Sequence, residues 1–155
     1  MKLRKYKPED AGQVIELFHD TVHTINAADY DEIQRNAWAP DRSPEFDEKF
    51  CKRLLENIAY VVEVEGKIIG FGDMTKEGFL DRVYTHKDYQ RQGVATLIYL
   101  QLEQEARELG FTEITSEVSI TAKPAAEKGG AIVLKVQDKV HNGIVFRNYL
   151  MKKKI

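Results

Sequence analysis

A short run near the middle of the chain, residues 89–96, has side chains suited to binding an anion. Gly93 and Ala95 leave the backbone open to a bulky phosphate group, and apolar residues at helical spacing follow them. The first turn of a helix has N–H groups without partners at the positive end of the helix dipole, where an anion can bind. The sequence therefore predicts a phosphate-binding turn, while a tight turn without a ligand would need the same small residues.

The segments around this turn alternate between strand and helix patterns. The turn follows a strand rich in aromatic and β-branched residues at 79–86, and it opens a helix at 94–109 with apolar residues at three- and four-residue steps. The other predicted strands are residues 3–6, 59–65, 67–75, 112–119, 132–140 and 144–152. The other predicted helices are residues 8–25, 43–57 and 121–128, with a further short helix around 30–36. This order, β-α-α-β-β-β-α-β-α-β-β, predicts one α/β domain over residues 1–155, with a mixed, mostly antiparallel sheet of about seven strands flanked by helices.

The composition is that of a globular chain without a strong charge. Of the 155 residues, 43% are hydrophobic and 31% are charged, and the formal net charge is -2. No apolar run approaches the ~20 residues that a membrane helix needs, and this charge gives no electrostatic reason to bind nucleic acid or an acidic membrane. Cys51 is the only cysteine, so we expect neither an internal disulfide nor a thiol-based metal cluster. His19, His86 and His141 have no partner at metal-ligand spacing, so we expect no bound metal. The first eight residues lack the apolar core of a signal peptide, and the default expectation is a cytoplasmic protein.

The motif Gln90-x-x-Gly93-x-Ala95 resembles the Gln/Arg-x-x-Gly-x-Gly/Ala signature of the GCN5-related N-acetyltransferases, the GNAT family. Phrases between residues 21 and 40 are similar to those of a bacterial subgroup of uncharacterised members. The predicted order of elements also resembles that of the family over almost the whole chain. The resemblance implies that acetyl-coenzyme A (acetyl-CoA) is the co-substrate.

By the same resemblance, acetyl-CoA would lie in a gap where the central strand splays from its neighbour. The backbone of Val83, Tyr84 and Thr85 would bond the pantetheine arm as an added strand would. The residues that would bind the pyrophosphate are Gln90, Arg91, Gln92, Gly93, Val94, Ala95 and Thr96.

Acetyl transfer to an amine requires a group that accepts a proton. An amine with a pKa near ~10.4 is almost wholly protonated at pH 7 and cannot attack a thioester in that form. Asp81 is the first candidate, because an inward-facing carboxylate among apolar neighbours has a raised pKa; an exposed Asp81 paired with Arg82 or a cross-strand lysine is the alternative. His23 is the second candidate, since imidazole titrates near pH 7, although a partly buried His with one hydrogen bond fits the same position.

Aromatic residues could form the wall of an acceptor pocket. Tyr30 and Trp38 lie in the irregular segment from 24 to 40, which corresponds to the variable substrate-covering region of the family, and Tyr84 lies on the central strand. Ordinary core packing accounts equally well for Trp38.

One departure from the family pattern concerns the helix after the fifth strand. Many members carry Phe-Tyr and then Glu-Lys-x-Gly-Phe there, and the tyrosine protonates the departing thiolate. In this chain Ala125, Ala126 and Ala131 replace all three aromatic residues. Releasing a thiolate with a pKa near ~8.5 costs only about 2 kcal/mol at pH 7, so the loss argues for a slower enzyme without excluding transfer.

The sequence thus favours an acetyl-CoA-dependent N-acetyltransferase that passes an acetyl group directly to an amine. The expected partner is a small-molecule or peptide amine, and we also expect a homodimer. A non-catalytic module that binds acetyl-CoA or CoA is the alternative, because the tyrosine acid is missing. A plain α/β interaction domain without a ligand is the third interpretation.

Overall fold

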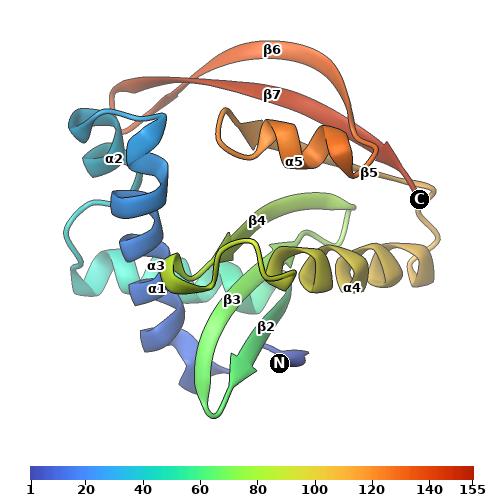
Figure 1. Ribbon diagram of the computed structural model, residues 1–155, viewed down its shortest axis with the longest axis horizontal. Helices are drawn as coiled ribbons and strands as arrows, with labels where there is room; N and C mark the ends of the chain where they lie inside the picture. The colour runs from blue at the N-terminus through green and yellow to red at the C-terminus, as the bar shows by residue number, and fades with distance from the viewer.

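One seven-stranded sheet runs through the whole molecule (Figure 1). The structure, a computed structural model, describes residues 1–155. The strand order is β1-β2-β3-β4-β5-β7-β6, and every neighbouring pair is antiparallel except β4 and β5. The strands are β1 Lys2–Lys5, β2 Ile58–Val64, β3 Lys67–Met74, β4 Phe79–Thr85, β5 Glu113–Ser119, β6 Ile132–His141 and β7 Ile144–Lys154. The helices are α1 Ala11–Thr24, α2 Glu32–Trp38, α3 Pro44–Glu56, α4 Val94–Glu108 and α5 Lys123–Lys128, with 3-10 turns η1 Pro8–Asp10, η2 Ile25–Ala28 and η3 Lys87–Tyr89.

Helices cover both faces of the first half of the sheet. On one face α1 and α3 pack against β2 and β3 through residues such as Phe18, Phe50 and Phe71. On the other face α4 packs through Ile98 and Leu102. β3 is therefore buried along almost its whole length and β2 through its middle, as strands covered on both faces are.

Two glycines of β3 let α4 approach the sheet closely. A Cβ atom at Gly70 would collide with Cγ1 of Val94, and one at Gly72 would lie 2.5 Å from Cγ2 of Ile98. Such distances are below van der Waals contact, so a larger side chain at either position would have to push α4 outward. Because Val94 is the first residue of α4, these glycines also fix where the helix begins.

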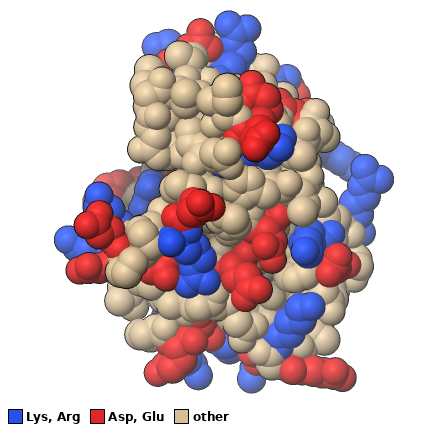
Figure 2. All heavy atoms as spheres, turned by 90° about the vertical axis from the view of Figure 1, so that its left-hand side faces the viewer, with Lys and Arg blue, Asp and Glu red and all other residues tan.

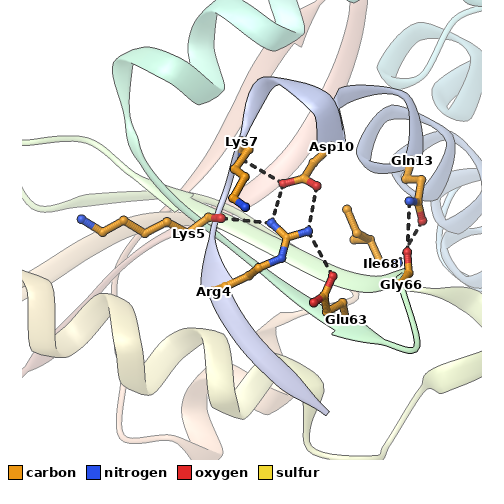
Figure 3. Close-up of polar contacts among 8 residues, drawn as sticks. All are labelled: Arg4, Lys5, Lys7, Asp10, Gln13, Glu63, Gly66 and Ile68. Atoms are coloured by element: carbon orange, nitrogen blue, oxygen red, sulfur yellow. Dashed lines mark hydrogen bonds and ion pairs between the residues drawn. The ribbon is translucent and has the colours of Figure 1, made fainter.

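A polar cluster fastens the N-terminal strand and α1 to the β2–β3 hairpin (Figure 3). Arg4 donates two hydrogen bonds of 2.8 Å to the carboxylate of Asp10 and a third of 3.1 Å to Glu63. These bonds hold the pKa of the Asp10 carboxyl below its usual range. Gln13 of α1 bonds both to the carbonyl of Gly66 and to the N–H of Ile68, so the hairpin is held at its tip as well.

The sheet divides between β4 and β5. These parallel strands pair only at Phe79 with Thr115 and at Leu80 with Ser116, after which they separate. The register between β3 and β4 also shifts at this level, since Asp73 pairs with Arg82 but Met74 pairs with Leu80. Asp81 is therefore the extra residue of a β-bulge, at the point where the gap opens.

The charged side chains are of mixed sign on the face seen from the left of Figure 1. Figure 2 shows Lys and Arg interspersed with Asp and Glu there, with one larger uncharged area in the upper left of the view. No helix of the chain combines the length and the apolar character needed to cross a bilayer.

The predicted fold class is confirmed, with small differences at the ends of elements. The short helix expected around residues 30–36 begins at Glu32, where Asp31 caps it by accepting a 2.7 Å bond from the N–H of Gln34. α5 begins two residues later than predicted, at Lys123. The final hairpin turn contains Asn142 and Gly143 at positive φ, and His141 belongs to β6.

Candidate active site

A cavity of about 300 Å³ occupies the gap between the two halves of the sheet. Residues of α1, η2, α2, β4, α4, β5, α5 and β7 line it. These segments are distant in sequence. They meet here because β4 and β5 have separated, and residues of α2 line the space left between them. The lining includes Asp81, Thr85 and Gln90, which the sequence proposed for the site.

The turn before α4 has the geometry of an anion site. Gly93 is the N-cap residue with φ +83, a left-handed conformation that favours glycine, and Arg91 also has a positive φ of 59. The first intrahelical bond runs from the N–H of Leu97 to the carbonyl of Gly93 at 3.1 Å. The N–H groups of the preceding residues, among them Ala95 and Thr96, therefore have no partner within the helix. A Cβ atom at Gly93 would meet nothing within 4 Å, so the space beside these donors is open.

Gln90 supports this turn from within. Its side-chain amide donates to the carbonyl of Thr85 at 2.8 Å and to that of His86 at 3.3 Å. The amide N–H groups are thus used by the protein backbone, and the predicted role of Gln90 as a phosphate ligand has to be replaced by one in shaping the loop. These two bonds brace η3 against the end of β4, which gives the amide side chain at this position a structural use.

The three residues predicted to bond the pantetheine arm differ in how they present their backbone. The N–H of His86 donates to the carbonyl of Ile69 on β3 at 2.8 Å. Since backbone groups alternate in direction along a strand, those of Tyr84 are directed at β3, and those of Val83 and Thr85 at the gap. The carbonyl of Thr85 already accepts a 3.0 Å bond from the Thr21 hydroxyl as well as that from Gln90. Val83 is consequently the residue with the most backbone capacity for a ligand.

Asp81 lies in a polar network at the edge of the cavity. Its side chain is only 6% exposed, and it accepts hydrogen bonds from Arg53 and, at 3.2 Å, from the amide of Asn57. The same amide donates to the fully buried Asp73 at 3.0 Å. Arg82 pairs with Asp73 through two bonds of 3.1 and 2.6 Å, and so it is not the partner of Asp81.

This environment raises the pKa of the Asp81 carboxyl. Burial is the largest cause, and the negative charge of Asp73 adds to it, while Arg53 and Arg82 act in the opposite direction. The Arg53 side chain is 57% exposed, so its charge is partly screened by water. A carboxylate with a raised pKa at the wall of a cavity is suited to accepting a proton.

His23 does not reach the cavity. Its Nε2 atom lies 2.7 Å from the carbonyl oxygen of Ala39, and its ring contacts that of His19 at a centroid distance of 4.5 Å. The ring therefore joins α1 to the end of α2, and we do not retain His23 as a base. The sequence could not show this, because the residue that uses the imidazole lies 16 positions away.

The predicted aromatic residues do come together at the cavity. The indole N–H of Trp38 donates to the hydroxyl of Tyr84 at 2.9 Å. Phe146 of β7, which the sequence did not single out, contacts Trp38 at a centroid distance of 5.4 Å and Tyr30 at 5.8 Å. All four side chains line the cavity, and Trp38 remains 37% exposed there. Burial raises the pKa of the Tyr84 phenol to about 12, so this hydroxyl stays protonated.

Tyr99 is a cavity residue that the sequence gave no reason to select. It lies one helical turn after Ala95 on α4, and both residues line the cavity, as does Ala125 of α5. The Tyr99 hydroxyl forms no side-chain hydrogen bond with the protein, and burial raises its pKa. Ala126, the position where the family pattern has tyrosine, is not part of the lining, and no residue of α5 is buried.

Comparisons with known proteins agree with this geometry. The profile of the Acetyltransferase (GNAT) family matches residues 21–127. The uncharacterized N-acetyltransferase YafP of Escherichia coli (strain K12) is 29% identical over 154 residues, which are 99% of this chain and 96% of that protein. The crystal structure of a GCN5-related N-acetyltransferase from Rhodopseudomonas palustris has a TM-score of 0.94 at 28% identity, with 99% of this chain and 95% of that one covered.

A more distant structure shows the same fold. The PaiA N-acetyltransferase from Thermoplasma acidophilum, determined in complex with coenzyme A, has a TM-score of 0.78 at 19% identity, with 99% of this chain and 98% of that one covered. The family profile extends from the end of α1 into α5 and so includes the turn before α4, the gap and the bulge. On this match over more than half of its length, the chain belongs to the acetyltransferase (GNAT) family.

Proposed function

We propose that this protein transfers an acetyl group from acetyl-CoA directly to the amine of an acceptor, with Asp81 as the base. The observation that carries the proposal is the position of Asp81 in the bulge where β4 leaves β5, because it places a desolvated carboxylate at the wall of the gap. Membership of the family indicates the class of reaction, N-acetyl transfer. The surroundings of Asp81 in this chain are the basis for assigning it as the base.

The coenzyme fits the elements that line the gap. The free N–H groups at the start of α4 and the open space beside Gly93 suit its pyrophosphate. The free edge of β4 suits the pantetheine arm, with Val83 as its main hydrogen-bonding residue. The backbone N–H groups would bind the pyrophosphate at Gln92, Val94, Ala95 and Thr96. Gln90 instead acts by shaping the loop.

The proton of the acceptor ammonium would move to a carboxylate oxygen of Asp81. The neutral nitrogen then forms a bond with the acetyl carbon, the bond between that carbon and the coenzyme sulfur breaks, and the nitrogen releases its second proton to water as the amide forms. The group that protonates the leaving thiolate regains its own proton from water. The Tyr99 hydroxyl, free of side-chain hydrogen bonds in a residue that lines the same cavity as Ala125, is our candidate for the group that protonates the leaving thiolate. It would replace a tyrosine that is absent at Ala126.

Two measurements test this function. Titration calorimetry should show that acetyl-CoA binds, and release of free thiol should depend on an added amine and should fall when Asp81 is replaced by Asn. Tight binding of acetyl-CoA without thiol release from any amine would favour the alternative, a non-catalytic module. No binding at all would reject both.

The remaining expectations concern assembly and location. We infer that the protein forms a homodimer, because β6 is an edge strand of the sheet and exposes Ile132, Leu134, Val136 and Val140. Sedimentation at several concentrations would test this inference, and a monomer at all of them would reject it. A cytoplasmic location and an acceptor of small-molecule or peptide type stay predictions.

A further inference from the structure

The charged side chains that line the cavity are paired, with one exception. Asp81, Arg82, Glu117, Arg147 and Arg35 are the five charged lining residues. Four ion pairs account for the first four of them. These pairs are Asp81 with Arg53, Arg82 with Asp73 at 2.6 Å, Glu117 with Lys139 at 3.3 Å and Arg147 with Asp138 at 3.2 Å. Arg35 has no carboxylate partner.

The Arg35 guanidinium has donors left for a ligand. Its Nη1 donates to the carbonyl of Tyr30 at 2.6 Å, and this is its one hydrogen bond. Its Nε is buried and has no partner, and Nη2, on the same edge of the group, bonds to no protein atom. A buried donor without an acceptor is unfavourable. The Nε–Nη2 edge of a guanidinium matches the two oxygens of a carboxylate.

The helix that carries Arg35 is held in place at both ends. Asp31 caps its first turn, and the amide of Asn142 in the β6–β7 turn donates to the carbonyl of Ala37 at 2.8 Å. Trp38 joins the same helix to Tyr84 of β4. Because α2 is fixed to both halves of the sheet, Arg35 is positioned before any ligand arrives, which lowers the entropic cost of binding.

We propose that the acceptor is an amine that also carries a carboxylate, which Arg35 binds while the amine lies at Asp81. This assignment rests on the function proposed above, since it takes Asp81 as the end of the cavity where the amine reacts. The zwitterion of an amino acid or of a peptide then meets opposite charges at the two ends of the site. A polyamine or an aminoglycoside would instead bring a second cation toward Arg35, and the site should disfavour it.

The test compares amino acids with their carboxamides, which keep the amine and the shape but lose the negative charge. A panel of amino acids and short peptides should be acetylated with kcat/KM about 10- to 100-fold higher than the matching amides, the range expected for a hydrogen bond to a charged group. Arg35→Gln should bring this ratio close to one, mainly through KM. Arg35→Lys should keep part of it, because the charge remains without the fork. Arg147→Gln, which removes a cation already paired with Asp138, should retain the wild-type ratio.

The outcomes separate this proposal from the function on which it rests. Equal rates for acids and amides in the wild type, or an unchanged ratio in Arg35→Gln, would overturn the carboxylate assignment while leaving acetyl transfer intact. Acetyl-CoA binding with turnover of neutral or polycationic amines alone would also overturn it. Loss of acetyl-CoA binding, or binding without any turnover, would count against the proposed function instead. A melting temperature for Arg35→Gln close to that of the wild type would confirm that the variant is folded.

Discussion

Replacing Asp81 by Asn should separate the catalytic role of this carboxylate from its effect on stability. The amide has almost the same shape, so packing against Asn57 is kept while basicity is lost. General-base catalysis typically contributes ~10²- to 10⁴-fold in rate. The activation barrier should therefore rise by about 3 to 5 kcal/mol, with the affinity for acetyl-CoA little changed.

The same substitution should leave the protein at least as stable at neutral pH. Burial and Asp73 raise the pKa of the folded carboxyl above its unfolded value, so an ionised Asp81 opposes folding. This destabilisation of the folded state is fully present above the folded pKa and is absent below the unfolded pKa of about 3.9. Each unit by which the folded pKa exceeds the unfolded one corresponds to about 1.36 kcal/mol. The free energy of unfolding of the variant should consequently increase relative to that of the wild type as pH rises from about 4 to 7.

Asp73→Asn is the matched control. Asp73 is fully buried and holds Arg82 by two hydrogen bonds, so breaking this pair should cost about 3 to 5 kcal/mol of folding free energy. Turnover with saturating acceptor and the free energy of unfolding from denaturant titrations measure both effects. An Asp81→Asn enzyme with unchanged turnover would refute the base assignment. One as unstable as Asp73→Asn would show that Asp81 is mainly structural.

Four further predictions concern the neighbours of this residue and the coenzyme site. Arg53→Gln removes a charge that lowers the pKa of Asp81, so the acidic limb of the profile of kcat/KM against pH should move to higher pH. An acidic limb at the same pH would show that a group other than Asp81 titrates there. Gly93→Glu should weaken acetyl-CoA binding at least about tenfold by calorimetry through like charge at the helix start, whereas Gly93→Ala, with the same backbone strain, should lose less. Tyr99→Phe should reduce kcat by roughly tenfold to a hundredfold if its hydroxyl protonates the thiolate, and an equal kcat would assign that proton to water. Gly70→Ala should lower the free energy of unfolding by about 1 to 3 kcal/mol through overpacking, and an unchanged denaturation midpoint would show that α4 yields freely.

Local patterns explain why most of the fold was predictable. The apolar spacing of α4 and the small residues at its start are properties of neighbouring positions, and both were recognised from the sequence. The register shift that places Asp81 in a bulge depends on pairing with Asp73 across two strands, and no local pattern shows it. The sequence identified Asp81 as a carboxylate on the central strand. The alternative it left open paired Asp81 with Arg82 or a cross-strand lysine, whereas the structure pairs it with Arg53 of α3.

Residues that matter through distant contacts were missed or given the wrong role. Arg35 lies on a short helix with a weak signal, and only the cavity shows that it lacks an anion. Phe146 fits the ordinary apolar alternation of a strand such as β7, so the sequence does not mark it as a site residue. Its place beside Trp38 depends on the packing of α2. Gln90 was recognised by its motif, yet its bonds to Thr85 and His86 show a structural use that a motif does not reveal.

The gap, the base and the coenzyme site have one structural origin. After Leu80 the two parallel strands lose their pairing, so the backbone of β4 is left with an unpaired edge that a ligand can use. The bulge at the same level turns Asp81 toward α3 and into the network with Arg53 and Asn57. On the other face, close packing permitted by Gly70 and Gly72 fixes the start of α4 beside this edge. A substitution that restored pairing between β4 and β5 would therefore be expected to close the coenzyme groove and move the base together, even though it changed no residue that touches either ligand.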